Sequence, residues 1–154
     1  MALLAGGTIA AGLYVFGDTA KSDPIATDEA LGRLRDGSLI LVDIRRPDEW
    51  ALTGVAVGAV PLDMRDDGFV AALDQLVGGD RAMPIALICA RGGRSRKLAA
   101  RLAEAGFSAV LEVSEGMLGS AAGPGWIARG FGLQSRLGAL LDSVADNIKG
   151  RTIC

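Results

Sequence analysis

Short apolar runs alternate along the chain with segments whose apolar residues recur at helical spacing. Three runs, LILVD, IALIC and AVLEV, occupy residues 39–43, 85–89 and 109–113. Runs this short and this apolar are typical of strands buried on both faces of a parallel sheet. A weaker run at 59–62 indicates a further short strand. The apolar pattern therefore predicts a buried sheet built from well-separated parts of the chain.

The segments between these runs place their apolar residues on one helical face. They predict a helix with Thr27 as its N-cap and Gly37 as its stop, a helical turn at 48–52 opened by Pro47, and helices at 69–77 and 94–105. Strands that alternate with helices in this way favour an α/β domain with a central, mainly parallel sheet flanked by helices.

Both ends of the chain depart from this alternation. Residues 2–17 are apolar and small, about 24 Å long as a helix against a bilayer core of about 30 Å. No Lys or Arg precedes the segment, and its best signal-type cleavage site, Val15 to Gly17, is poor. A signal sequence, a membrane anchor and a helix packed on the domain or a partner all stay open. Membrane association or export is favoured, with a cytoplasmic protein as the alternative.

The C-terminal tail has the pattern of an amphipathic helix over residues 135–150. Packing on the same domain is its first interpretation and self-association its second. The chain thus divides into an apolar segment at 1–21, one α/β domain at 22–132, and a helical tail at 133–154.

Composition narrows the chemistry. The 154 residues suffice for one domain, and a net charge of −2 argues against a nucleic-acid-binding protein. The chain has no histidine, which excludes Ser-His-Asp and Cys-His mechanisms and removes the commonest metal ligand. Two cysteines, Cys89 and Cys154, form neither a disulfide framework nor a zinc motif. We expect no metal and no cofactor.

Cys89 stands where a ligand site is expected in such a sheet, at the end of a buried strand and ahead of a helix. Gly92 and Gly93 let the loop curl so that its N–H groups point inward, and the helix adds its positive N-terminal end. Arg91 and Arg94 offer planar forks of donors to an oxyanion. These features favour a thiolate over a thiol, so Cys89 is the candidate nucleophile and Ala90, Arg91, Gly92, Gly93, Arg94 and Ser95 form its anion cradle.

A phosphatase-type loop is the main alternative arrangement. That loop places five residues between cysteine and arginine, whereas four separate Cys89 from Arg94 here. The smaller loop favours a smaller reacting group, such as a single transferred sulfur atom.

The chain resembles a single-domain rhodanese of the thiosulfate sulfurtransferase family. CARGGRS at 89–95 is similar to the family's active loop, LVDIRRPDEW at 41–50 to its upstream segment, and VGAVPLDM (57–64) and AGFSAVLEVSEGMLG (105–119) to its later segments. The family's usual Gly-His-Ile is replaced by TGVAV at 53–57. The match runs from about residue 25 to 131.

The resemblance implies a three-layer fold and an enzyme that moves sulfane sulfur from an anionic donor such as thiosulfate, through a Cys89 persulfide, to cyanide, a thiol or a protein thiol. It implies that Asp43 and Arg45 support the loop, although a structural ion pair explains them equally well. Trp126 is expected in the core. Trp50 is expected there as well, with a place at the mouth of the pocket as its alternative. A persulfide carrier without fast turnover, and an arsenate reductase or phosphatase of the same fold, remain alternatives.

Overall fold

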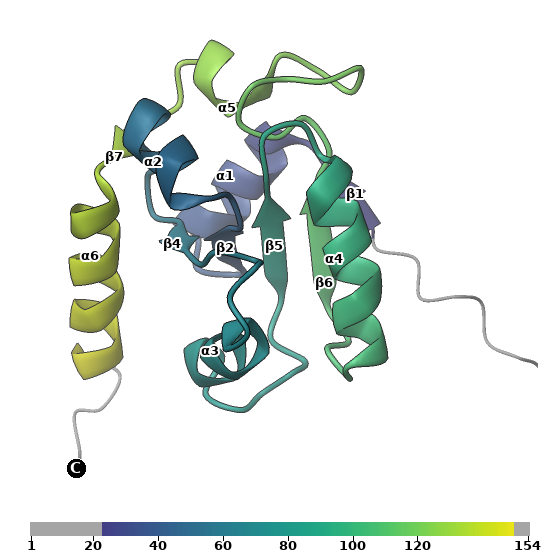
Figure 1. Cartoon of the computed structure of the whole chain (residues 1–154), viewed down its shortest axis with the longest axis vertical. Coiled ribbons are helices and arrows are strands. Elements are labelled where there is room, and N and C mark those ends of the chain that lie inside the picture. Colours follow the sequence, from purple (N-terminus) through teal and green to yellow (C-terminus); the bar gives the residue numbers. More distant parts are fainter. Residues whose placement is uncertain (1–22, 150–154) are drawn as a thin grey trace, which may run out of the picture.

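The computed structural model describes residues 23–149, with side chains up to residue 145. The expectations for residues 1–21 and for Cys154 lie outside the described residues. Five strands form one sheet in the order β1-β6-β5-β2-β4, and each neighbouring pair is parallel (Figure 1). Their bounds are β1 (Asp23–Ile25), β2 (Ile40–Asp43), β4 (Val60–Pro61), β5 (Ile85–Ile88) and β6 (Val110–Val113).

Helices cover both faces of this sheet. On one face lie α1 (Thr27–Arg35) and α2 (Pro47–Thr53), and on the other lie α3 (Phe69–Leu76) and α4 (Gly93–Glu104). The remaining elements are β3 (Val55–Ala56), α5 (Gly125–Ala128), β7 (Leu133–Gln134) and α6 (Arg136–Lys149), with β3 and β7 forming a small antiparallel pair. The three-layer α/β fold is therefore confirmed.

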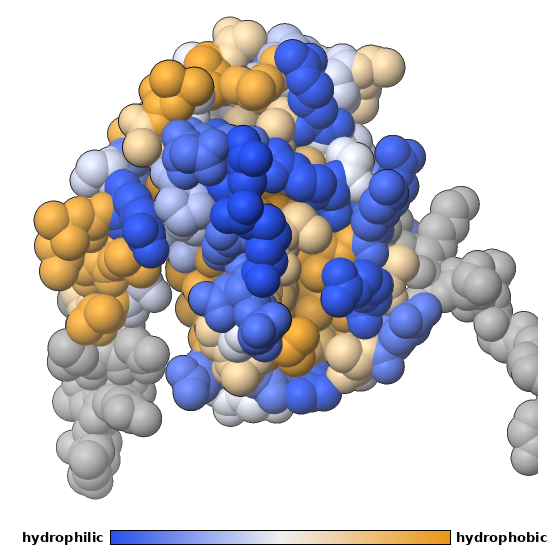
Figure 2. All heavy atoms as spheres, viewed as in Figure 1, coloured by the Kyte–Doolittle hydropathy of each residue, from blue (hydrophilic) through white to orange (hydrophobic). Residues whose placement is uncertain are grey.

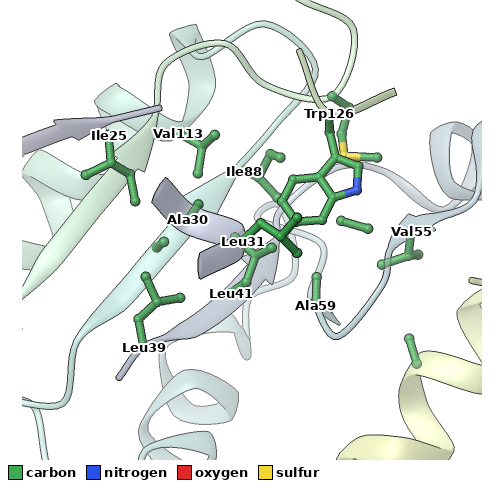
Figure 3. Close-up of a cluster of buried hydrophobic side chains, with 14 of the residues drawn as sticks. Ile25, Ala30, Leu31, Leu39, Leu41, Val55, Ala59, Ile88, Val113 and Trp126 are labelled. Carbon is green, nitrogen blue, oxygen red and sulfur yellow. The ribbon is translucent and has the colours of Figure 1, made fainter. Parts of the chain in front are cut away.

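Two apolar clusters fill the spaces between the layers because successive strand residues point to opposite faces. Leu41 and Ile88 join Trp126 in the cluster beneath α1 and α2 (Figure 3). Trp50 belongs to the same cluster. Val42, Leu87 and Cys89 face α3 and α4 in the second cluster. Trp50 is 3% exposed and Trp126 is fully buried, which confirms both as core residues.

The start of the first helix differs from the sequence prediction. Ala26, not Thr27, is the N-cap of α1, and no side chain caps it. Thr27 is buried as the first helical residue, and its N–H donates to Glu115 Oε1 at 3.3 Å. A carboxylate 88 residues away thus replaces the local cap. Strands β1, β3 and β7 and helix α5 were not predicted, since two to four residues are too few to show a period.

The amphipathic tail forms α6, but its leucines do not face the domain as the packing interpretation expects. Ala139 is the residue buried against the domain, and α6 runs beside the edge strand β4. Leu137, Leu141 and Val144 are 67%, 61% and 57% exposed. They form much of the apolar patch over α6 in Figure 2. Within residues 23–149, no helix is both long and apolar enough to cross a membrane.

Candidate active site

The candidate site lies at the carboxyl edge of the sheet. Cys89 directly follows β5, the central strand, whose neighbours β2 and β6 end beside it at Asp43 and Val113. Because all these strands are parallel, the loops that follow them meet at this one edge. Residues 89–95 pass from β5 into the first turn of α4.

Glycine permits the loop's tight path. Gly92 is the N-cap of α4 and has the left-handed backbone φ of 79°. A Cβ at this position would overlap the carbonyl oxygen of Ser114, which follows β6. Gly116, with φ of 68°, approaches the loop from the other side, and its added Cβ would lie 2.5 Å from the Ala90 carbonyl oxygen. The loop and the segment after β6 therefore touch backbone to backbone.

This backing segment engages the carbonyl side of the loop. The N–H of Met117 donates to the Cys89 carbonyl at 2.8 Å, and the N–H of Leu118 donates to the Ala90 carbonyl at 2.9 Å. With its carbonyls held this way, the loop can keep its N–H groups for another acceptor.

The N–H side of the loop has no acceptor among residues 23–149. No hydrogen bond within that range engages the backbone N–H groups of residues 90–95. The hydroxyl of Ser95 is buried and likewise has no partner within the described chain. Unpaired donors at the start of a 12-residue helix form an anion-binding site, reinforced by the helix dipole. The sequence-predicted residues Ala90 to Ser95 thus follow Cys89 as a loop and first helical turn whose N–H groups have no acceptor within the described chain.

Cys89 is a free thiol and is 1% exposed. It packs in the second apolar cluster, with Leu98 and Ala99 of α4 among its members. Its burial allows only a small reacting group to reach the sulfur. Residues 23–149 contain no cluster of three or more metal-ligating side chains.

Arg94 is held by a residue to which the sequence analysis gave no role. Its Nη1 and Nη2 donate to Glu49 Oε2 and Oε1 at 2.8 and 2.6 Å. This bidentate bond lowers the pKa of Glu49 to about 2 and raises that of Arg94, which the Cys89 sulfur raises further. Arg94 therefore lies near the thiol while its fork is occupied by a carboxylate.

Arg91 is the other arginine of the loop and is exposed. Its Nη1 donates weakly, at 3.4 Å, to the carbonyl of Gly119, and no carboxylate among the described residues forms an ion pair with it. Of the two loop arginines, Arg91 is the one whose charge is available to a ligand.

Asp43 and Arg45 form a buried ion pair beside the loop. Arg45 Nη2 lies 2.7 Å from Asp43 Oδ2, and both residues are at most 1% exposed. The guanidinium also donates to Thr53 Oγ1 and to the Gly54 carbonyl, at 2.8 and 2.7 Å. The pair thus fastens the end of β2 to the end of α2, and within the described residues it forms no hydrogen bond with residues 89–95.

Glu49 is the site residue that sequence reasoning missed. A signal for it exists in the chain. Pro47 opens a helix just after β2, so a carboxylate in the first turn of that helix lies at the carboxyl edge of the sheet. The Cys89 loop follows the adjacent strand β5 and lies at the same edge. The distance of 45 residues from Arg94 hides the pairing itself.

A family model for the rhodanese-like domain matches residues 26–122. The chain belongs to the rhodanese-like domain family. The match covers β2, the Cys89 loop and the segment after β6 that backs it. Membership in this family indicates a sulfurtransferase-type function in general terms. Among curated proteins, none matches the chain.

Solved structures share the rhodanese-like fold. The polysulfide-sulfur transferase homodimer from Wolinella succinogenes is 22% identical, with a TM-score of 0.59, and the match covers 77% of this chain and 82% of that one. Wild-type EanB is 18% identical, with a TM-score of 0.59. The match covers 77% of this chain but only 28% of EanB, which is a much longer protein. An EanB variant with ergothioneine covalently linked to a cysteine persulfide is 19% identical, with a TM-score of 0.56, and the match covers 75% of this chain and 28% of that one.

Proposed function

We propose that this rhodanese-like domain is a sulfurtransferase that carries sulfane sulfur on Cys89. The donor is a small anionic sulfur compound such as thiosulfate, and the acceptor is cyanide, a thiol or a protein thiol. One observation carries the proposal. The N–H groups of residues 90–95 directly follow the free thiol Cys89 in the loop and have no acceptor within the described chain. Such free donors stabilise the negative charge on the outer sulfur of a persulfide.

In the first step, the Cys89 thiolate attacks the outer sulfur of the donor. A new S–S bond forms to Cys89 as the donor's own S–S bond breaks. With thiosulfate, the products are a Cys89 persulfide anion and sulfite, so the total charge of −3 is unchanged and nothing is oxidised overall. The loop N–H groups and the N-terminal end of α4 stabilise the thiolate and then the persulfide.

In the second step, a nucleophilic acceptor takes the outer sulfur and restores the Cys89 thiolate. Cyanide becomes thiocyanate, and a thiolate becomes a persulfide. No histidine is needed, because the attacking groups in both steps are already anions.

The arginines supply charge at the loop. Arg91 meets the anionic part of the donor, and Arg94 holds its position beside the sulfur through Glu49. Asp43 and Arg45 support the site by fixing α2. Each guanidinium adds a charge-assisted bond or a positive potential that favours the leaving anion.

Mass spectrometry after thiosulfate treatment tests the assignment. One added sulfur, about 32 Da, is expected on the wild-type chain and on Cys154→Ser, because the proposed site for the sulfur is the Cys89 loop. Cys89→Ser should gain none. Equal labelling of Cys89→Ser would overturn the proposal.

The burial of Cys89 favours one second candidate, a persulfide carrier without fast turnover. A sulfur atom on a residue that is 1% exposed exchanges slowly with any acceptor, which suits a protein that holds its sulfur between transfers. Steady-state formation of thiocyanate separates the two functions, since a carrier labels once and then stops. The loop length argues against a phosphatase or an arsenate reductase.

A further inference from the structure

The first turn of α2 places a closed group of charges against the Cys89 loop. Glu49 accepts hydrogen bonds from both Nη atoms of Arg94. Its Oε2 also accepts the backbone N–H of Arg46 at 3.1 Å and lies 3.3 Å from Arg46 Nε. Arg46 in turn pairs with Asp48 at 2.8 Å. Two arginines and two carboxylates make this group neutral.

The neutral group changes the charge that a donor meets at the loop. The sequence alone suggests two cationic forks, Arg91 and Arg94. In the structure the fork of Arg94 is filled by Glu49, whose side chain is 20% exposed, so the bond is partly shielded from water. Arg91, together with the N-terminal end of α4, is left to receive the donor's charge.

We infer that Glu49 is a specificity-determining residue, which by occupying the fork of Arg94 directs the loop toward sulfur donors of low charge, namely thiol persulfides, and away from dianionic thiosulfate. The inference rests on the proposed sulfur transfer through Cys89. It names the donor class of that same site. Glu49 acts through Arg94 and does not touch the reacting atoms, so its role is one of positioning and charge.

The chemistry of the two donors explains the selection. Thiosulfate brings two negative charges to the Cys89 thiolate, so its transition state holds three and gains from every free guanidinium. A thiol persulfide, R–S–SH, reacts with the thiolate to give a Cys89 persulfide and R–S⁻, with one negative charge throughout. The S–S bond of the donor breaks as the new one forms, and no electrons are gained or lost overall. A carboxylate beside the loop therefore opposes thiosulfate far more than it opposes the persulfide.

The contacts of Glu49 with the two arginines also keep its charge, and with it the preference between donors, constant across pH. The carboxylate of Glu49 is bound by Arg94 and Arg46, which keeps its pKa at about 2. Glu49 is thus charged at any pH well above 2. Protonation of the carboxyl cannot release Arg94 during turnover.

The test compares second-order rate constants for Cys89 persulfide formation with thiosulfate and with cysteamine persulfide, a thiol persulfide whose ammonium group offsets the charge of its sulfur. Wild type is compared with Glu49→Gln, which keeps the side chain's shape and removes its charge. We expect the thiosulfate-to-persulfide ratio to rise about tenfold or more in Glu49→Gln, since Arg94 then gains a charge-assisted bond to the donor. The thiosulfate rate should also fall more steeply with added salt than in wild type.

Two further variants make the result specific. Asp48→Asn removes a charge from the same helix turn without touching Arg94 and should move the ratio less than about twofold, because Asp48 is 67% exposed. Glu49→Gln combined with Arg94→Gln should return the ratio to the wild-type range or below it. A merely structural role for Glu49 would slow both donors together and leave their ratio unchanged.

The outcomes are distinguishable. An unchanged ratio in folded Glu49→Gln, or an equal rise in Asp48→Asn, would overturn the inference and leave sulfur transfer standing. A wild-type protein that takes sulfur from neither donor would overturn the proposed function itself. Thermal melts check folding, and Glu49→Ala, expected to shift the ratio in the same direction, replaces Glu49→Gln if that variant unfolds.

Discussion

At the scale of single residues, the candidate site depends on backbone approach more than on side chains. Gly92 turns the chain with a φ of 79°, and the Ser114 carbonyl occupies the space a Cβ would need. A left-handed conformation costs a non-glycine residue about 1–2 kcal/mol even in open space. The overlap adds to that, because backbone cannot move aside as a flexible side chain can.

Gly92→Ala should therefore lose about 2 kcal/mol or more of unfolding free energy and most of its persulfide formation, because the loop must open to admit the methyl group. Urea unfolding and mass spectrometry after thiosulfate treatment measure the two effects. Gly32→Ala is the matched control. Gly32 is exposed within α1 with open space around it, so alanine there should add about 0.5–1 kcal/mol. Normal sulfur loading in Gly92→Ala would show that the cradle does not need this turn.

At the scale of elements, one buried carboxylate joins three parts of the chain. Glu115 is 2% exposed and follows β6. It accepts the N–H of Thr27 at the start of α1, the N–H of Gly125 at the start of α5, and two donors of Arg129. The bonds from Arg129, and then from these backbone groups, lower the pKa of Glu115 to about 2. The charged form is thus strongly favoured in the folded protein.

The sign of the resulting pH dependence follows from this lowered pKa. The folded state binds the Glu115 proton less readily than the unfolded state, whose pKa is about 4.5. The stabilisation, about 3 kcal/mol, is complete above pH 4.5 and is lost as pH falls toward 2. Glu115→Gln should therefore be destabilised by about 3 kcal/mol at pH 7, with a much smaller deficit near pH 2.5. Urea unfolding at the two pH values measures the difference.

Glu29→Gln serves as the control for that comparison. Glu29 is an exposed residue of α1 that lies 3.8 Å from Arg33, and an exposed pair of this kind contributes at most about 0.5 kcal/mol. If Glu115→Gln were equally unstable relative to wild type at both pH values, its charge would not be the stabilising feature.

At the scale of the whole molecule, the first and last described elements lie at opposite edges of the sheet. Strand β1, which begins at Asp23, forms one edge, and α6 packs beside β4 at the other (Figure 1). The five-stranded sheet, its helices and the Cys89 loop are all built from residue 23 onward. The apolar residues 2–17 are therefore proposed as an attachment segment, to a membrane or to another copy of the chain.

A chain lacking residues 1–20 should fold, with a melting temperature within a few degrees of the full chain, and should load sulfur on Cys89 as fast. Full-length protein should sediment with lipid vesicles or self-associate, and the shortened form should remain monomeric, since burying apolar residues 2–17 drives the association. Analytical ultracentrifugation and vesicle sedimentation test this. A shortened chain that unfolds would instead make the segment part of the core.

The exposed face of α6 needs its own control in that experiment. Leu137 and Leu141 are more than half exposed, so replacing both by serine should leave the fold intact. If association persists in the full-length double-serine protein and disappears only on shortening, the N-terminal segment drives it. Loss of association in the double-serine protein would assign it to α6.

The sequence by itself determined the features that depend on local periodicity. Apolar runs at 39–43, 85–89 and 109–113 predict β2, β5 and β6 to within a residue, because strands buried on both faces are mostly apolar. The Cys89 loop was equally predictable, since its glycines, the strand before it and the helix after it are contiguous in the chain. Family-like segments spread over residues 41–119 then indicated the fold.

Only the tertiary structure decided how these parts face one another. Arg94 stands among cationic residues in the sequence, yet its partner is Glu49, 45 residues earlier, because β2 and β5 are adjacent in the sheet. Glu115 caps α1 from 88 residues away, a task assigned by sequence to Thr27. The buried side of α6 is Ala139 and not its leucines, since a small residue allows close approach to β4. Such pairings depend on strand order and side-chain reach, which no local pattern records.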